Sequence, residues 1–320
     1  MLLKQADCRA ADIAALEALA KRPGVDSATR KAIELEKRKL LSGVKGEKDA
    51  AYHLDFSFGS SKNSVLIHDL RLEHQGRVAQ IDHLLINRLL DVWLFESKRF
   101  VTGIGINEYG ECSAFYGGRA VGIPSPFEQN ERHIDVLKSV FRDKAVTLPS
   151  RLGFDIRPSY LPRVLVSSNA RISRPKVKRA ETAMIVKADQ VRSLVDRDYT
   201  DSTNASGLRA VAKIVSRETL YDFGARLVAA HRPASFDWAA RFGLSDVPVA
   251  PRIATTPPMQ PSVPSAPATQ STCAACDTSV SQKVVDYCAE NQKRFAGHVF
   301  CYKCQRDRAR RQAVMQIAAE

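Results

Sequence analysis

Two apolar runs decide the fold, QIDHLLI at residues 80–86 and, after a short turn, VWLFESK at residues 92–98. Short runs rich in Val, Ile, Leu and aromatic residues are typical of β-strands. If the two strands form a hairpin centred on Leu89, Asp82 lies directly opposite Glu96, with Cβ atoms about 5 Å apart. Two carboxylates at that separation repel each other unless a cation lies between them. The hairpin therefore predicts a divalent-metal site.

A lysine completes this pattern. Glu96 and Lys98 are two residues apart, so their side chains share one face of the strand. The set Asp…Glu-x-Lys suits phosphodiester hydrolysis: Asp82 and Glu96 would hold Mg²⁺ or Mn²⁺, which activates a water, while Lys98 orients the nucleophile or offsets the developing negative charge. The pattern is short, and a solvated strand end is the alternative interpretation.

The periodicity of the rest of the chain predicts further helices and strands. Helical spacing of three and four residues covers three segments: 11–54 with a break at 22–24, 126–142, and 208–231. Strands are predicted in a β-meander that starts at Ser64, then at 161–167 and 183–187. Helices that alternate with strands in this way indicate an α/β domain, with a mixed sheet flanked by helices.

Several short motifs occur in the order seen in the nuclease-related domain (NERD) family, over roughly residues 42–170. They are Gly46-Glu47, Gln80-Ile81-Asp82-His83, Glu96-Ser97-Lys98, Gly103-Ile104-Gly105, and Ser125-Pro126-Phe127-Glu128-Gln129-Asn130 with His133. On these motifs the segment resembles that family, which is similar to the PD-(D/E)XK nucleases. The resemblance implies a restriction-endonuclease-like fold.

The resemblance also implies roles for single residues. Asp82 and Glu96 would be metal ligands and Lys98 the catalytic lysine. Glu47 would be a helix carboxylate that positions water or a second ion, and Gln129 a polar group near the phosphate. On the sequence alone, Glu47 also fits a solvated helix charge, and Gln129 fits a residue that braces its helix.

Some positions depart from the family pattern. The family often has Asn or Thr beside the lysine strand and Asn before the helix proline, where this chain has Ser97, Arg99 and Ser125. We expect this difference to affect substrate contacts more than the metal ligands. His83 and His133 are interpreted as structural histidines.

The composition divides the chain into four segments. Residues 1–41 are predicted to be N-terminal helices, 42–240 the nuclease-like α/β domain, 241–272 a linker and 273–320 a small zinc ribbon with a basic tail. Seven prolines lie between residues 248 and 267, with Arg252 as the only charge between Val247 and Thr272. Such a segment is expected to be an extended tether.

The net charge indicates the class of partner. There are 48 Lys and Arg against 35 Asp and Glu, which gives a formal charge of +13. This excess favours an anionic partner such as nucleic acid, although a generally basic solvated surface is the simpler alternative. No apolar run approaches the length of a membrane span, and we expect no membrane partner and a cytoplasmic location.

Four of the seven cysteines form two C-x-x-C pairs, Cys273 with Cys276 and Cys301 with Cys304. This spacing predicts a structural Zn²⁺ held by four thiolates, with the two knuckles at the ends of a small hairpin. The alternative is a pair of redox sites, which would lack zinc. Cys288 lies between the pairs and is expected to be a packed thiol.

Basic and aromatic residues surround the second knuckle. They are Lys293, Arg294, Phe295, Phe300, Tyr302, Lys303, Arg306, Arg308, Arg310 and Arg311. This mixture suits backbone contacts and base stacking on nucleic acid, whereas a solvated basic helix and a protein-binding ribbon are alternatives.

The sequence as a whole predicts a metal-dependent nuclease, with DNA favoured over RNA, assisted by a tethered zinc ribbon. The main alternative is a nucleic-acid-binding or adaptor protein that keeps the fold without cutting. A homodimer is a further expectation, because many nucleases of this fold class act as dimers. For the N-terminal helices, residues 1–40, a dimer surface, a brace for the sheet and a partner site are alternatives, and the sequence assigns none of them.

Overall fold

The computed structural model describes residues 1–98, 103–116, 119–177, 179–206, 213–245 and 272–305. The chain divides into two compact units, Met1–Val247 and Pro248–Glu320, and each is described by itself. The predicted linker lies almost wholly outside the described residues.

A six-stranded sheet forms the centre of the first unit, in the order β1-β2-β3-β4-β10-β12. Its strands are β1 (Leu2–Lys4), β2 (Ser64–His74), β3 (Arg77–Asn87), β4 (Asp91–Lys98), β10 (Ser159–Val166) and β12 (Ile185–Lys187). Strands β2, β3 and β4 are antiparallel, whereas β1, β10 and β12 pair in parallel with their neighbours. The sheet is therefore mixed.

A second, four-stranded sheet has the order β11-β5-β6-β7. Its strands are β5 (Gly103–Ile106), β6 (Cys112–Tyr116), β7 (Arg119–Ile123) and β11 (Arg171–Ser173). A separate hairpin consists of β8 (Ser150–Arg151) and β9 (Phe154–Asp155). The motif Gly103-Ile104-Gly105 lies in β5, so the sequence motif marks the start of this second sheet.

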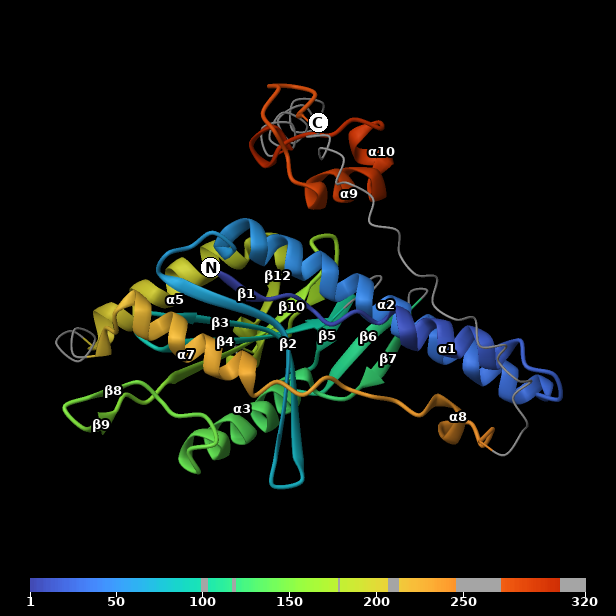
Figure 1. Cartoon of the computed structure of the whole chain (residues 1–320), viewed down its shortest axis with the longest axis horizontal. Helices are drawn as coiled ribbons and strands as arrows, with labels where there is room; N and C mark the ends of the chain where they lie inside the picture. Colours follow the sequence, from blue (N-terminus) through green and yellow to red (C-terminus); the bar gives the residue numbers. More distant parts are fainter. Residues whose placement is uncertain (99–102, 117–118, 178, 207–212, 246–271, 306–320) are drawn as a thin grey trace, which may run out of the picture. The chain divides into compact units, whose positions relative to one another are not determined.

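Helices cover both faces of the central sheet (Figure 1). They are α1 (Ala10–Ala20), α2 (Ser27–Phe58), α3 (Pro126–Arg142), α4 (Ala180–Met184), α5 (Val191–Ser206), α7 (Arg217–Ala229) and α8 (Trp238–Arg241), with a 3₁₀ turn at Ala188–Gln190. Helices α2 and α5 pack on one face, and α3 and α7 on the other.

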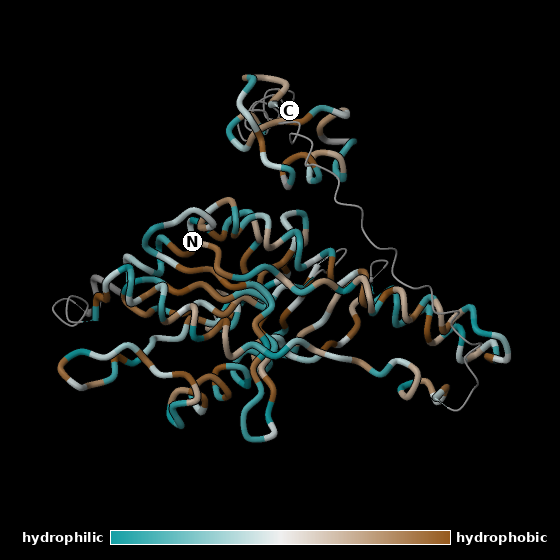
Figure 2. The backbone as a smooth tube through the Cα atoms, in the orientation of Figure 1, coloured by the Kyte–Doolittle hydropathy of each residue, from teal (hydrophilic) through white to brown (hydrophobic). Residues whose placement is uncertain are grey.

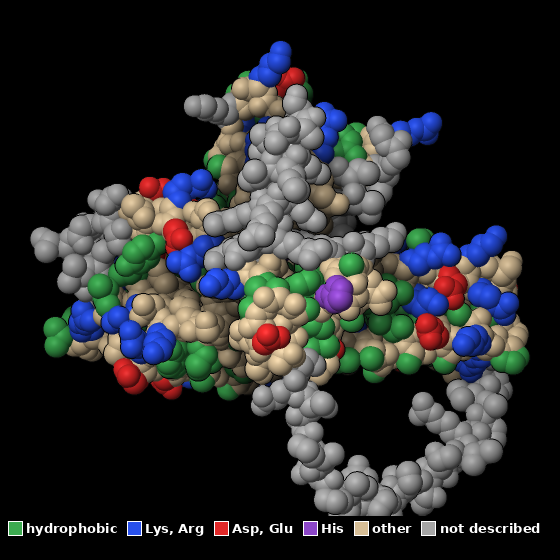
Figure 3. All heavy atoms as spheres, turned by 90° about the horizontal axis from the view of Figure 1, so that it is seen from above, with side chains coloured by type: hydrophobic (Ala, Val, Ile, Leu, Met, Phe, Trp, Pro, Cys, Tyr) green, Lys and Arg blue, Asp and Glu red, His purple; other side chains and the backbone are tan. Residues whose placement is uncertain are grey.

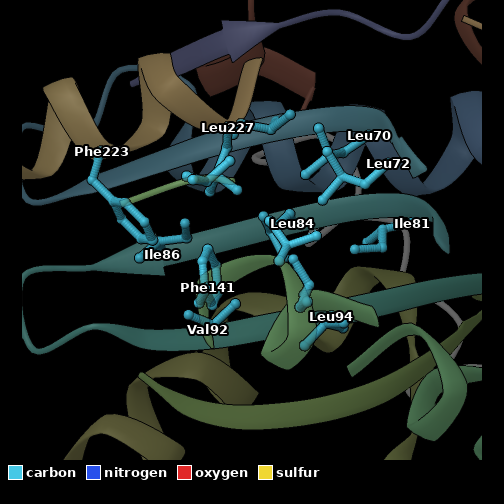
Figure 4. Close-up of a cluster of buried hydrophobic side chains, with 14 of the residues drawn as sticks. Leu70, Leu72, Ile81, Leu84, Ile86, Val92, Leu94, Phe141, Phe223 and Leu227 are labelled. Atoms are coloured by element: carbon cyan, nitrogen blue, oxygen red, sulfur yellow. The ribbon is translucent and has the colours of Figure 1, made fainter. Parts of the chain in front are cut away.

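The two faces of the sheet carry separate apolar cores. One core joins β2, β3 and β4 to α3 and α7, and Figure 4 shows Phe141 and Phe223 of these helices close to Ile86 and Val92. The other core joins Trp93 and Phe95 to α2 and α5. In Figure 2 much of the tube along these strands has the brown colour of hydrophobic residues. This is expected for a sheet that is covered on both faces.

Helix α2 is long because its ends are well defined and one stripe is apolar. The Asp26 side chain caps its first turn by accepting hydrogen bonds from the backbone of Ala28 and Thr29 at 2.8 and 3.0 Å. Its second half buries Gly46, Ala50, Leu54 and Phe58, each four residues apart. The helix continues through residue 41 without a break, so it joins the predicted N-terminal segment to the α/β domain.

The predicted α/β architecture, with a mixed sheet flanked by helices, is confirmed. The helix predicted at 126–142 is observed with those bounds, and it begins with Pro126 after the Ser125 cap. The break predicted at 22–24 is also observed, because α1 ends at Ala20 and α2 begins at Ser27. Only part of the helix predicted at 208–231 can be compared: α7 covers Arg217–Ala229, and residues 207–212 lie outside the described part.

Figure 3 shows the face of the molecule seen from above, where Lys and Arg side chains have acidic side chains among them. Oppositely charged side chains also pair along α2, where Lys37 pairs with Glu34 and Lys39 with Glu36. None of the described helices is long and apolar enough to span a membrane.

The second unit contains two described helices between its cysteine pairs, α9 (Gln282–Glu290) and α10 (Gln292–Phe295). The prediction of a hairpin between the knuckles was therefore wrong. Val284 and Cys288 are four residues apart on α9, and both are buried with Phe295 and Phe300. Residues four apart lie on one face of a helix, so α9 places both in one small core.

Candidate active site and four-cysteine cluster

The predicted site residues come from three layers of the first unit. Asp82 lies on β3, and Glu96 and Lys98 lie at the end of β4. Glu47 comes from α2 on one face of the sheet, and Gln129 from the first turns of α3 on the other. The site is thus built where the sheet ends between two helices.

The register of β3 and β4 agrees with the predicted hairpin. The observed pairs run from Ile86 with Val92 to His83 with Phe95, and Leu84 lies opposite Leu94. Asp82 and Glu96 are the next residues along this register. The predicted juxtaposition of the two strand positions is therefore supported by the pairing that precedes them.

Glu96 is a buried carboxylate with one oxygen left over. Its side chain is 2% exposed, and its Oε1 lies 2.5 Å from the Lys98 Nζ. The Lys98 Nζ also donates to Gln129 Oε1 at 3.3 Å. Among the described residues, no hydrogen-bond donor contacts Glu96 Oε2, which is buried as well. A buried anion with an uncovered oxygen is costly unless a cation occupies that side.

Asp82 is held by the strand that carries the lysine. Its Oδ2 accepts hydrogen bonds from the Ser97 backbone N–H and from the Ser97 Oγ, both at 2.8 Å. Among the described residues, the hydrogen bonds of the Asp82 side chain go to Oδ2. Ser97, at a position where the family pattern often differs, therefore fixes the orientation of a predicted metal ligand.

The pKa values show that these groups are electrostatically coupled. Burial, followed by the charge of Asp82, raises the pKa of Glu96 to about 8. Burial, followed by Asp82 and Asp69, raises the pKa of Glu47 to about 7. Burial also raises the pKa of Asp82. Burial would lower the pKa of Lys98, but the carboxylates, Glu96 first, raise it above its ordinary value.

Asp69 is a carboxylate of this cluster that the sequence analysis missed. It lies on β2 between the pairs His68 with His83 and Leu70 with Ile81, so it faces Asp82 across the hairpin. Its φ of 52° is in the left-handed region, which is uncommon for a residue other than glycine. The register around the Gln75-Gly76 turn could have revealed it, because that turn places position 69 opposite 82.

The strand alternation changes phase at both aspartates. Ile67 and Leu70 are three residues apart, with His68 and Asp69 between them, and yet both face the same core. Ile81 and Leu84 also share that core, and Asp82 lies between them. A regular strand alternates strictly, so the backbone departs from the regular pleat where the two carboxylates lie.

His68 and His83 form a buried pair behind the carboxylates. Their Nδ1 atoms lie 2.8 Å apart, and His68 Nε2 contacts Asp55 Oδ1 at 3.0 Å. Burial, followed by His68, lowers the pKa of His83 well below its ordinary value. Burial, followed by Arg132 and Lys98, lowers the pKa of His133 to about 4. Near neutral pH these two side chains are uncharged, consistent with the structural roles predicted for them.

The donor set of the carboxylate cluster fits a hard divalent cation. Asp82 and Glu96 offer oxygen ligands, which Mg²⁺ and Mn²⁺ prefer, and Glu96 Oε2 is buried without a partner among the described residues. The charge of Asp82 raises the pKa of Glu47, so a nearby positive charge would stabilise the ionised form of both carboxylates. Lys98 supplies one such charge, and a divalent ion would supply the rest.

The four predicted cysteines meet in the second unit. The Sγ atoms of Cys273, Cys276, Cys301 and Cys304 all lie within 4.8 Å of one another, the separation that one tetrahedral ion requires. Among the described residues, these cysteines are the one group of three or more His, Cys, Asp or Glu side chains whose ligand atoms lie this close together. The cluster fits the predicted zinc ribbon.

The pKa values of the four thiols show that they do not all ionise without a bound cation. Hydrogen bonds from Thr278 lower the pKa of Cys276 to about 6, which favours its thiolate. Cys276 and Cys301 in turn raise the pKa of Cys304 to about 12. A bound cation would remove this conflict, because it stabilises all four thiolates together.

Two of the aromatic residues predicted to stack on bases do not have that role. Phe295 is 2% exposed and Phe300 is 5% exposed, because both fill the core of the small unit. Tyr302 is exposed. The side chains of Lys293 and Arg294 and all residues after Gln305 lie outside the described part, so the predicted basic surface is not compared further.

Residues 42–158 match the family model of the nuclease-related domain, NERD. The chain contains a nuclease-related domain. The match includes all five predicted site residues, Glu47, Asp82, Glu96, Lys98 and Gln129. Searches of curated proteins and of solved structures find no match to the chain. The segments on either side of the NERD match, among them α1, α5, α7 and the four-cysteine unit, lie outside the matched residues.

The carboxylates of the NERD domain predict a pH dependence of its stability. In the absence of divalent metal, Glu96 and Glu47 have raised pKa values in the folded protein. Above pH 4.5, the ordinary glutamate pKa, these two side chains therefore keep protons in the folded protein that they lose in the unfolded chain. The stabilisation is complete below that pKa and is lost as the pH rises through the folded values. The melting temperature of the first unit is therefore expected to fall between about pH 5 and pH 8.

Thermal unfolding across this pH range tests the expectation. Mn²⁺ should restore the melting temperature at pH 8, and Glu96→Gln should flatten the decline because it removes a group whose pKa is raised to about 8. Glu34→Gln, whose side chain pairs with Lys37 on the surface, is the control and should keep the full slope. An unchanged slope in Glu96→Gln would contradict the assignment.

Proposed function

We propose that the NERD domain of this chain is a metal-dependent nuclease that hydrolyses phosphodiester bonds, with DNA as the substrate to test first. The observation that supports this most directly is Glu96, a buried carboxylate whose Oε1 pairs with Lys98 and whose Oε2 has no partner among the described residues. A simple structural ion pair would not leave a second buried oxygen uncovered.

The residues of the site would divide the chemistry among them. Asp82 and Glu96 would hold Mg²⁺ or Mn²⁺, and the ion would supply Lewis-acid charge and an acidified water at the scissile phosphate. Ser97 orients Asp82 for this task. Glu47, whose pKa of about 7 keeps it close to half protonated near neutral pH, would take a proton from the attacking water.

Lys98 is fixed from two sides, by Glu96 at 2.5 Å and by Gln129 at 3.3 Å. Its ammonium group would therefore offset the negative charge that develops on the phosphate without first having to be ordered. Gln129 accepts the hydrogen bond of Lys98 through Oε1, so its role in this proposal is to orient the lysine.

The four-cysteine unit would bind Zn²⁺ and assist substrate binding as a second, tethered contact. A linked second site raises the local concentration of substrate without any new contact at the first. The reduced state of the four thiols that zinc requires also supports a cytoplasmic location. A formal charge of +13 agrees with a polyanionic partner.

The test is a cleavage assay with end-labelled single- and double-stranded DNA and RNA, using zinc-loaded full-length protein with Mg²⁺, with Mn²⁺ or with neither. Cleavage that needs the added metal and is lost in Asp82→Asn would support the proposal and identify the substrate. Binding without cleavage, equal in wild type and Asp82→Asn under all three conditions, would instead establish a nucleic-acid-binding protein on a nuclease fold.

A further inference from the structure

Asp69 differs from Glu96 in that both of its oxygens have partners. Its Oδ1 accepts a hydrogen bond from the Gln80 side chain. Its Oδ2 accepts one from the Asp7 backbone N–H at 3.1 Å and lies 3.5 Å from Arg9 Nη2. Its side chain is only 6% exposed. Asp69 therefore contributes charge to the cluster, and protein groups hold both of its oxygens in place.

The segment that brings Arg9 is attached firmly to the sheet. It follows β1, which pairs with β2, and the Lys4 Nζ contacts Asp7 Oδ1 at 2.8 Å and the backbone oxygens of His68 and Asp69 at 3.2 and 3.0 Å. The Arg9 side chain is 15% exposed, and its second acidic neighbour is Asp12 at 3.8 Å. Arg9 lies outside the residues that match NERD.

The charges that act on one another in this cluster explain what Arg9 does. Among the described residues, four acids, Glu47, Asp69, Asp82 and Glu96, are opposed by two bases, Arg9 and Lys98. When all four acids are ionised, these six groups carry a formal charge of −2, which one divalent cation neutralises. Without Arg9 the cluster would carry −3, and the charge of Asp69 would act on Glu47 and Asp82 unopposed.

We propose that Arg9 is a positioning residue of the NERD site: it holds Asp69 in an ion pair and cancels its charge, so that the cluster binds one divalent cation at Asp82 and Glu96 with moderate affinity. This inference rests on the proposed function, because it assumes that these two residues bind metal. It assigns to the segment before α1 a direct part in setting metal affinity.

Mn²⁺ binding tests the inference without any substrate. Free Mn²⁺ is measured by electron paramagnetic resonance during titration of the zinc-loaded, full-length protein, for wild type, Arg9→Gln, Arg9→Lys, Asp69→Asn and the double variant Arg9→Gln/Asp69→Asn. Arg192→Gln is the matched control, because Arg192 pairs with Asp196 at 2.8 Å on the exposed surface of α5. Thermal melts confirm that each variant is folded.

The two single substitutions are expected to change the Mn²⁺ affinity in opposite directions. Arg9→Gln should bind Mn²⁺ roughly tenfold more tightly and Asp69→Asn roughly tenfold more weakly, the scale on which a unit charge a few ångström from an ion acts in a protein. The double variant should return to the wild-type value, and Arg9→Lys and Arg192→Gln should keep it. A purely structural role for Arg9 predicts weaker binding in Arg9→Gln, because the site would be disordered.

One outcome would overturn this inference alone. In that outcome the wild type binds one Mn²⁺ ion, Asp82→Asn abolishes this binding, and Arg9→Gln binds Mn²⁺ equally or more weakly than the wild type. Wild type that binds no Mn²⁺ in an Asp82-dependent way would overturn the proposed metal site together with the inference. The two failures are therefore distinguishable in one set of titrations.

Discussion

Replacement of Lys98 by methionine is expected to lower the rate of metal-dependent cleavage by about 10³-fold, the effect typical of removing one preorganised group that stabilises transition-state charge. The methionine side chain retains most of the volume of lysine and none of its charge. Because Lys98 opposes the charges of Glu96, Asp82 and Glu47, its loss should leave Mn²⁺ binding intact or make it tighter. Reduced cleavage combined with retained metal binding is the diagnostic result.

Single-turnover cleavage with saturating enzyme measures this effect, with Mn²⁺ titrations run on the same preparations. Lys138→Met is the matched control, since Lys138 lies on the exposed surface of α3 and pairs with Asp135 at 3.5 Å. Lys98→Arg tests whether charge alone suffices. Full activity in Lys98→Met would exclude the lysine from the chemistry, even if the protein proves to be a nuclease.

Removal of zinc is expected to unfold the second unit completely while leaving the first unit folded. The described core of the small unit consists of five buried residues, two of which are themselves cysteines: Cys273, Val284, Cys288, Phe295 and Phe300. So small a core does not offset the entropy of folding, and zinc binding typically contributes about 10 kcal/mol or more to such modules.

Hydrogen exchange with peptide resolution distinguishes the two units. Cys276→Ser should abolish protection of α9 and α10 and lower the zinc content by one ion per chain, with the protection of β2, β3 and β4 unchanged. Cys8→Ser, at an exposed cysteine away from the cluster, is the control. Persistent protection of α9 in the zinc-free protein would show that the module folds without metal.

The strands that carry the metal ligands could be predicted because their information is local. The turn between Ile86 and Val92 is short, and one register alone keeps the apolar residues of both strands on matching faces. That register brings Asp82 and Glu96 together without any knowledge of the rest of the fold. The same reasoning applied to the β2–β3 turn would have found Asp69.

The contribution of the N-terminal segment could not be predicted in this way. Strand β1 pairs with residues that follow it by more than 60 positions, and its three residues carry no periodic pattern of their own. The contact between Arg9 and Asp69 depends on that long-range pairing. Phe295 and Phe300 were wrongly assigned to a binding surface for a related reason: in a unit with few apolar residues, the aromatic side chains are needed for the core.

Helix α2 links the site to a distant part of the first unit. Asp26 caps one end, Glu47 lies 20 residues beyond Ser27, and a helix rises about 1.5 Å per residue, so the capped end lies about 30 Å from the acid. The outer half packs on α1 and α8 through Ile33, Leu16 and Trp238. An uninterrupted helix behaves as a stiff rod, so a small tilt at that outer contact displaces Glu47 relative to the strands. The alignment of the carboxylate proposed to take a proton from the attacking water thus depends on the packing of α2 against α1 and α8.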